Sequence, residues 1–406
     1  MYLEHLSLTN FRNYARLELD LAPGLTVFTG TNAQGKSNLL EAIYFLATTK
    51  SFRGVGDREL IDWWAAESGL NWARVDAIVR RERGLLRVEV VVQDDKDDGA
   101  QTVGPRGKGG TTKRVRLNQI PKRAIDLIGQ VNVVMFAPQD LDLILGPPPV
   151  RRRYLDITVS QVDPRYCRSL AHYNRVLLQR NNLLRQIRDG KARPDQLSFW
   201  DREMARSGAY IISRRLDTVQ DLDGKAQHLH HRLTGNAETL SIKYVSSLLA
   251  AERGVEVPAT QQTALEEEFL HQLSEVQSRE MLQGSSLLGP HRDDVAFLLD
   301  GRAASSFASR GQQRTITISL KLGEADFMAE QAGEQPILLL DDVMSELDDA
   351  RREDLRGAII GQRQALVTTT DLSLFGSELL HDAAIYRVEQ GTLQRIARGQ
   401  ESDSVA

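Results

Sequence analysis

Cysteine is nearly absent from the sequence, and so are long apolar runs. The single cysteine, Cys167, cannot form an internal disulfide, so nothing calls for an oxidising compartment. No stretch approaches the ~18–20 uninterrupted apolar residues that cross a bilayer. The first residues, MYLEHLSLTNFR, lack the basic-then-apolar order of a signal peptide. These absences exclude disulfide-stapled secreted folds and membrane spans, and we expect a cytoplasmic α/β protein.

The residues that are present indicate a globular chain with unevenly distributed charge. The 406 residues are 41% hydrophobic and 26% charged, with a net charge of −4, which predicts one large core or two unequal ones. Seven cationic residues and no acid lie between Arg106 and Arg123. Eleven cationic residues and three acids lie between Arg151 and Arg193. Such runs suit a polyanion-binding protein, but each is equally consistent with a solvated surface that acids elsewhere balance in space.

Hydrophobic periodicity places strands near both ends of the chain and helices between them. The strands predicted from alternation or from apolar runs are 3–8, 17–21, 25–29, 337–340 and 365–368, with two more between 75 and 92. The predicted helices are 166–187 and 197–222, which form an antiparallel hairpin, and 264–282. A glycine-rich segment, 94–112, is expected to be a mobile loop. The pattern predicts an α/β domain from 1–150 and 285–406, with an inserted helical domain at 151–284.

A glycine-rich loop follows the strand at 25–29 and precedes a helix. Its sequence, GTNAQGKS, satisfies GxxxxGK[ST] in the strand–loop–helix context that a P-loop requires. Backbone N–H groups of such a loop surround phosphate oxygens, Lys36 would reach the β- and γ-phosphates, and Ser37 would ligate Mg²⁺. The alternative is a strand–helix turn with an incidental lysine. The residues predicted to bind ATP here are Gly30, Thr31, Asn32, Ala33, Gln34, Gly35, Lys36, Ser37 and Asn38, with Arg12 as a further candidate phosphate contact.

Two acids end the apolar strand in ILLLDDVMSELD, residues 337–348. Asp341 at the strand tip is predicted to bind Mg²⁺, and Asp342 to orient or deprotonate an attacking water. An apolar strand ending in two acids is common by itself, but together with the P-loop it predicts an ATPase.

A third motif, SRGQQR (309–314), opens a predicted helix and resembles the signature motif of ABC-type ATPases. In that class a serine and a glycine contact the γ-phosphate of a nucleotide held by another subunit. Ser-Glu-Leu-Asp at 345–348 resembles the D-loop, and Thr-Thr-Thr-Asp at 368–371 lies where the switch residue is expected. Gln139 is a candidate Q-loop residue for Mg²⁺ and water. The signature residues predicted to contact nucleotide are Ser309, Arg310, Gly311 and Gln312.

The combination of motifs resembles the RecF family of bacterial recombination and gap-repair proteins, which is related to the ATPase heads of SMC proteins. The resemblance covers most of the chain. The matching stretches are LTNFRNY, GTNAQGKSNLLEAIY, RRRYLD with the residues before it, LLGPHRDD, SRGQQRT, LLLDDVMSELD and VTTTD. It implies an ABC/SMC-type ATPase head with a P-loop mixed sheet and an inserted α-helical domain.

The resemblance also implies a function. Two subunits would dimerise head-to-head around two ATP molecules, each P-loop facing the other subunit's signature. The dimer would bind duplex DNA and single-strand/double-strand junctions, and would assist RecA loading with RecO and RecR. Its ATPase would be weak and DNA-stimulated, with hydrolysis promoting release.

Three alternatives to a RecF-like ATPase are considered, and a feature of the sequence counts against each. In a transporter's nucleotide-binding subunit the P-loop and signature lie about a hundred residues apart by family expectation, against 275 here (311 − 36). A full SMC protein needs helical arms far longer than the predicted insertion at 151–284. An inactive scaffold would have lost Lys36, Ser37 or the two acids, all of which are present.

Several polar residues stay open to structural interpretations. The candidate DNA contacts are Lys113, Arg114, Arg116, Arg151, Arg152 and Arg153, although the last three can equally hold the fold together. QHLHHR (227–232) is expected to be a solvated helix face rather than a metal site. GPHRDD, which contains His291 and Arg292, predicts a fixed turn without an assigned chemical role.

Overall fold

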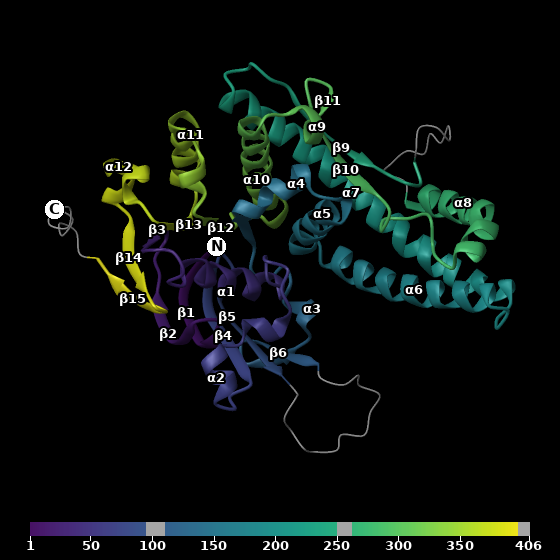
Figure 1. Cartoon of the computed structure of the whole chain (residues 1–406), viewed down its shortest axis with the longest axis horizontal. Coiled ribbons are helices and arrows are strands. Elements are labelled where there is room, and N and C mark those ends of the chain that lie inside the picture. The colour runs from purple at the N-terminus through teal and green to yellow at the C-terminus, as the bar shows by residue number, and fades with distance from the viewer. Residues whose placement is uncertain (95–109, 250–261, 397–406) are drawn as a thin grey trace. The chain divides into compact units, whose positions relative to one another are not determined.

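The structure is a computed structural model that describes residues 1–94, 110–249 and 262–396. It divides into two compact units, 1–140 with 328–406, and 141–327 (Figure 1). The second unit is wider than the expected helical insertion at 151–284 and includes the signature motif. Within the described ranges, no helix is long and apolar enough to cross a membrane.

The first unit contains a six-stranded mixed sheet in the order β15-β14-β3-β13-β12-β8. Pairing is parallel from β14 to β8, and only β15 runs antiparallel to its neighbour. All five residues of β12 are buried, as expected for an apolar strand between two parallel neighbours. The strands are β3 (Gly24–Thr29), β8 (Val133–Phe136), β12 (Ile337–Asp341), β13 (Gln364–Thr369), β14 (Ala384–Glu389) and β15 (Thr392–Arg395).

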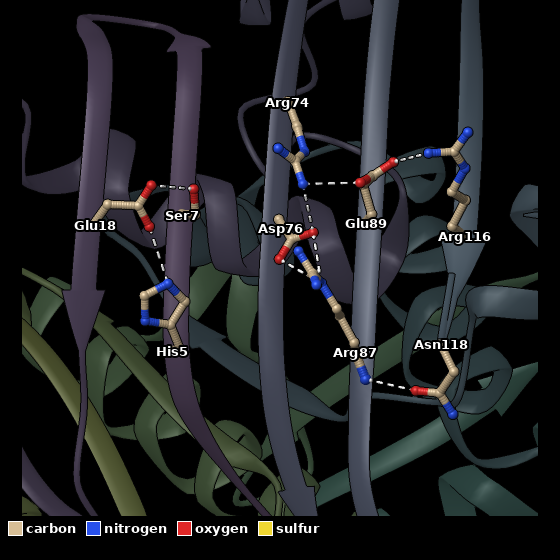
Figure 2. A network of polar contacts seen from close by, with 9 residues as sticks. All are labelled: His5, Ser7, Glu18, Arg74, Asp76, Arg87, Glu89, Arg116 and Asn118. Carbon is tan, nitrogen blue, oxygen red and sulfur yellow. Dashed lines mark hydrogen bonds and ion pairs between the residues drawn. The ribbon is translucent and has the colours of Figure 1, made fainter. Parts of the chain in front are cut away.

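A second six-stranded sheet of this unit is antiparallel throughout, in the order β2-β1-β4-β5-β6-β7. Apolar residues of one face are buried, and the other face carries a ladder of charged side chains (Figure 2). In that ladder Arg74 contacts both Asp76 and Glu89, each at 3.0 Å. The strands are β1 (Tyr2–Phe11), β2 (Tyr14–Asp20), β4 (Trp72–Arg81), β5 (Gly84–Asp94), β6 (Thr111–Leu117) and β7 (Ile120–Lys122).

Helix α1 (Lys36–Thr48) connects these sheets, because it contacts β4 and β5 of one and β8, β12 and β13 of the other. Eleven of its residues are buried, which is typical of a helix between two layers. The P-loop at its N-terminus is thereby anchored to the unit's core. The shorter helices are α2 (Trp63–Glu67), α3 (Ala124–Leu127), α11 (Asp349–Ile360) and α12 (Ser377–His381).

The second unit is mainly helical. Helices α6 (Pro164–Arg188) and α7 (Leu197–Leu233) lie side by side, and α8 (Gln262–Gln283) contacts both (Figure 1). These match the predicted hairpin and third helix. A small sheet, β11-β10-β9, was not predicted in full, because β9 lies inside the segment read as helical. The remaining elements are α4 (Asp142–Leu145), α5 (Pro148–Val162), β9 (Leu240–Val245), β10 (Asp294–Leu299), β11 (Arg302–Ala303), α9 (Ala304–Phe307) and α10 (Arg310–Ala332), whose C-terminal end belongs to the first unit.

The glycine-rich segment expected to be a loop lies mostly outside the described residues, at 95–109. Its flanks are strands rather than loop, since Asp94 ends β5 and Thr111 begins β6. The two strands pair with each other from Asp94 opposite Thr111. The segment therefore connects neighbouring antiparallel strands.

Candidate nucleotide-binding site

The P-loop connects β3 to α1, as the sequence predicts. Gly30 has a φ of +149°, and a Cβ there would lie 2.5 Å from the backbone oxygen of Val388, so only glycine fits. Lys36 Nζ donates to the carbonyl oxygens of Gly30 (2.6 Å) and Thr31 (2.8 Å). Burial lowers the pKa of Lys36, and the nearby acids Asp342 and Asp341 oppose that shift. The loop therefore surrounds the side chain of Lys36 and binds it through backbone carbonyl groups.

Segments distant in sequence brace this loop. Asn13 Nδ2 and the backbone N–H of Gly391 both donate to the carbonyl oxygen of Gln34, at 2.9 and 3.0 Å. Asn38 Nδ2 donates to Asn13 Oδ1 at 2.9 Å, and the Tyr14 hydroxyl donates to the carbonyl of Gly35 at 3.0 Å. Residues of the LTNFRNY stretch therefore position the loop from outside, a role that the motif alone did not reveal.

The tip of β12 meets the start of α1. Ser37 Oγ donates to Asp341 Oδ1 at 2.6 Å, although the two residues are 304 positions apart. Thr368 Oγ1, at the end of β13, donates to the same oxygen at 2.8 Å. A hydroxyl and a carboxylate are hard oxygen ligands of the kind that Mg²⁺ takes together with phosphate oxygens. Ser37 and Asp341 thus fit a Mg²⁺ site.

Asp342 has an unusual local geometry. Its φ is 52°, and its backbone N–H donates to the side chain of Thr368 at 3.0 Å. Its Oδ1 is buried and has no hydrogen-bond partner among the described residues. Burial raises the pKa of Asp342, with Lys36 opposing and Asp341 adding to the shift. A buried carboxylate oxygen without a partner, beside a P-loop, suits a group that orients water.

Arg12 was predicted to contact phosphate, but its guanidinium is engaged elsewhere. Nε and Nη2 form a two-pronged pair with the fully buried carboxylate of Glu41, at 2.9 and 2.8 Å. Nη1 donates to the carbonyl of Glu59 at 2.7 Å. In the structure Arg12 therefore holds α1, and its contact with phosphate stays a prediction. Arg53, which the sequence reading missed, donates to Asn38 Oδ1 at 3.0 Å beside the loop.

Gln139 lies at the same sheet edge as the two acids. β8 pairs in parallel with β12, with Phe136 opposite Leu340, so both strands end on one side. Gln139 follows three residues later in a short 3-10 helix and is exposed. The predicted switch segment follows β13, where Thr369 Oγ1 donates to the carbonyl of Asp371 at 2.9 Å.

The signature motif starts helix α10 in the second unit. Ser309 and Gln312 form a reciprocal cap: Ser309 N–H donates to Gln312 Oε1 at 2.7 Å, and Gln312 N–H donates to Ser309 Oγ at 3.3 Å. Ser309 and Arg310 are exposed, and Gly311 lies in the first turn. A capped helix N-terminus with exposed N–H groups favours an anion.

Glu238 and His230, of which only His230 is fully buried, support this cap. Gln312 Nε2 donates to Glu238 Oε1 at 2.8 Å, while Glu238 Oε2 contacts His230 Nε2 at 3.2 Å. His230 Nδ1 lies 3.3 Å from Ser319 Oγ on α10. His230 is fully buried, so the prediction of a solvated face is wrong for this residue, because helix α7 turns it toward α10. Burial lowers the pKa of His230, with Glu238 opposing.

Most of the candidate DNA contacts are engaged in pairs within their own units. Lys113 Nζ contacts Asp57 at 2.7 Å and the Thr49 carbonyl at 2.5 Å, and Arg116 contacts Glu89 at 3.3 Å (Figure 2). The sheet face thus resembles the balanced surface that was the alternative interpretation. Arg114 and Arg153 are exposed.

The two remaining candidates, Arg151 and Arg152, hold α5 against the GPHRDD turn. Arg151 forms a two-pronged pair with Asp294, at 2.7 and 2.8 Å, and Arg152 Nη1 donates to the carbonyl of Asp293 at 2.7 Å. The turn is fixed, as predicted, by Arg292 N–H donating to the Gly289 carbonyl at 2.8 Å. The RRRYLD and GPHRDD motifs therefore contact each other and together hold α5 in place.

Comparison with known proteins places this site in a family. The RecF/RecN/SMC N terminal domain model matches residues 2–393. DNA replication and repair protein RecF of Chloroflexus aurantiacus is 46% identical over 398 residues, covering 96% of this chain and 99% of that protein. The RecF protein of Halalkalibacterium halodurans is 39% identical over 397 residues, covering 97% and 100%.

Solved structures agree. The recombination mediator protein RecF with ATP, described as acting in the RecFOR pathway, has a TM-score of 0.83 and 30% identity, with 98% of each chain covered. An Smc head bound to the C-terminal winged-helix domain of ScpA, at 13% identity and a TM-score of 0.52, shares the fold, with 99% of this chain and 98% of that chain covered. The fold is thus the predicted ATPase head with a mixed sheet, and this chain belongs to the RecF family.

Proposed function

We propose that this protein is an ATP-dependent DNA-binding clamp of recombinational gap repair. The observation that carries the proposal is the 2.6 Å contact between Ser37 of the P-loop and Asp341 of β12, which brings the two halves of an ATPase site together. A solved relative of 30% identity is described with ATP, which supports the same ligand here. The proposed setting is the cytoplasm, where duplex DNA is available.

Each residue of the site has a role in this proposal. Lys36 would exchange the carbonyls of Gly30 and Thr31 for the β- and γ-phosphates. Ser37 and Asp341, with Gln139 as a further candidate, would hold Mg²⁺, which when bound offsets charge on the phosphate oxygens. Asp342 would orient the water that adds to the γ-phosphorus and take up its proton as the bond to the β-phosphate breaks, leaving ADP and phosphate.

Dimerisation would follow from the signature. Ser309 and Gly311 stand at an exposed helix N-terminus that favours negative charge, and they belong to a different unit from the P-loop. Two copies would each offer this N-terminus to the other's γ-phosphate. Because ATP binds between subunits only when both are present, dimer affinity and ATP affinity are coupled, and hydrolysis removes that coupling.

The DNA and protein partners proposed for this chain are those expected of a RecF family member. The dimer would bind duplex DNA and single-strand/double-strand junctions through backbone phosphates, with a steep salt dependence. Of the six candidate DNA contacts, Arg114, Arg116 and Arg153 are exposed, and Arg116 is paired with Glu89. RecO and RecR would act with it in loading RecA, and the ATPase would be weak and DNA-stimulated.

The central test is sedimentation of the protein without nucleotide, with ADP and with ATP, each with and without a duplex. The wild-type chain should become a dimer only with ATP. Lys36→Ala should weaken ATP binding by at least tenfold, about 1.4 kcal/mol, and stay monomeric. The exposed Lys191→Ala is a matched control and should dimerise normally.

A second variant separates nucleotide binding from pairing. Ser309→Arg should bind ATP as a monomer but fail to dimerise, because a bulky cation replaces the small cap. A wild-type protein that stays monomeric at saturating ATP, or a Ser309→Arg protein that still dimerises, would refute the shared-nucleotide clamp.

A further inference from the structure

Helices α6 and α7 line an open polar cavity of about 360 Å³ in the second unit. Each helix supplies four residues at the spacing i, i+3, i+4, i+7, which places them on one face. We call this the α6–α7 seam. Its lining consists of Arg165, Arg168, Ser169 and His172 from α6, Glu203, Arg206, Ser207 and Tyr210 from α7, and Gln262 from the start of α8.

Both ends of the seam are closed by contacts across the helices. At one end the Arg165 guanidinium lies over the Tyr210 ring, 4.1 Å from its centroid. At the other end His172 Nε2 contacts Glu203 Oε2 at 2.8 Å. The only carboxylate that lines the cavity, among the residues described, is therefore already paired.

Two arginines lie between these closed ends, one on each helix. Neither Arg168 nor Arg206 has a hydrogen-bond or ion-pair partner within the described ranges, and both are exposed. Most other arginines of this unit are paired, including Arg180, which is fully buried against Glu280 at 2.7 Å. Their guanidinium groups therefore offer unpaired N–H donors from both helices to the same pocket.

The N–H and O–H donors that line the seam fit a phosphate group. A guanidinium offers two parallel N–H donors that match phosphate oxygens, and a tetrahedral phosphate can accept from two such groups on opposite walls. The hydroxyl of Ser169 adds a further donor within the same lining.

We propose that the α6–α7 seam binds a backbone phosphate of DNA through Arg168 and Arg206. The proposal rests on the DNA-binding function proposed above and assigns that contact to α6 and α7 rather than to the arginines of RRRYLD in the same unit. Contacts of this kind position a protein on DNA without reading its sequence.

The test is titration of a labelled duplex with the full-length protein and ATP at several salt concentrations. Arg168→Ala/Arg206→Ala should lower duplex affinity roughly tenfold and reduce the slope of log affinity against log salt by about one to two. The matched control is Arg175→Ala/Arg202→Ala, which removes two exposed arginines from the same helices outside the cavity. That pair should change affinity by less than about threefold.

The outcomes separate this proposal from the clamp itself. Equal losses in both pairs would show a general charge effect and overturn the seam. Binding of poly-glutamate that depends on Arg168 and Arg206, with duplex binding unchanged, would assign the seam to an acidic protein and overturn it too. A wild-type protein with no duplex affinity would refute the proposed DNA function. ATP-dependent dimerisation should persist in both double variants, and its persistence would show that they are folded.

Discussion

Asp342 has a left-handed backbone conformation, with φ at 52°, which is uncommon for residues other than glycine, although aspartate adopts it more often than most. Its Oδ1 is buried without a partner among the described residues, and Lys36 is its main electrostatic counterweight. Such a residue costs stability unless another molecule completes its contacts. The strain is thus consistent with a catalytic position.

Asp342→Asn should slow ATP hydrolysis roughly 10²- to 10⁴-fold while ATP binding remains, because the amide cannot accept the proton of the attacking water. The ATP-bound dimer should then persist in sedimentation runs long after the wild type has returned to monomer. Asp349→Asn, at an exposed carboxylate seven residues on, is the control. Normal turnover in Asp342→Asn would show that another group positions the water.

His291 is a second residue with a perturbed environment. Its Nδ1 lies 2.7 Å from the Tyr173 hydroxyl. Burial lowers the pKa of His291 to about 4, a hydrogen bond with the Ser286 carbonyl opposes this, and nearby arginines add to it. In the unfolded chain the imidazole takes up a proton below about pH 6.5. Between pH 6.5 and 4 the unfolded state therefore binds a proton that the folded state does not.

Folding stability should accordingly fall as the pH drops from 6.5 to 4, by about 1 kcal/mol at pH 5.5 from this group. His291→Gln cannot take up a proton and should lose that part of the acid sensitivity. Urea unfolding at pH 7.5 and 5.5 measures the difference, with the exposed His228→Gln as control. The same pH dependence in wild type and His291→Gln would contradict a neutral buried imidazole.

At the scale of elements, the start of α10 depends on a residue from outside the signature. Glu238 lies between α7 and β9, yet its carboxylate accepts from Gln312 and contacts His230. The motif SRGQQR predicted the helix start and its cap. It could not indicate Glu238, because that contact joins residues 74 positions apart.

Glu238→Ala should raise the ATP concentration needed for dimerisation roughly tenfold, because losing a charged hydrogen-bond partner leaves Gln312 unsupported. ATP binding by the monomer should not change. Glu238→Gln keeps an acceptor oxygen and should restore most of the effect. Sedimentation across an ATP titration distinguishes these cases, and wild-type behaviour of Glu238→Ala would remove Glu238 from any positioning role.

Local patterns predicted the elements of the site well, and long-range pairing explains what they missed. The P-loop and ILLLDD each depend on a few adjacent residues, so their strands and helix could be predicted directly. The basic runs could not be judged in this way. Arg151 meets Asp294 and Lys113 meets Asp57, and only the folded chain shows that these charges cancel. β9 was missed because a six-residue strand between helices gives a weak periodic signal.

At the scale of the whole molecule, the proposed sharing of nucleotide between two subunits would make stability depend on protein concentration. Ligand that binds only the folded state adds about 2.7 kcal/mol at a hundredfold excess over its Kd. For the wild type with ATP, the melting temperature should also rise with protein concentration, since dimerisation adds to it. In Ser309→Arg, ATP should still raise the melting temperature, but the melting temperature should not depend on protein concentration. Thermal melts over a tenfold concentration range provide the measurement, and identical concentration dependence in both proteins would argue against dimerisation through the signature.

The parallel sheet has a consequence for synthesis on the ribosome. β3 lies between β13 and β14, and β8 pairs with β12, so neither early strand has its sheet neighbour until residues after 337 emerge. The nascent chain must carry the P-loop and two unpaired strand edges through most of translation. Chaperone protection should therefore matter most during that interval, and nucleotide cannot assist folding before residues 337–369 have been made.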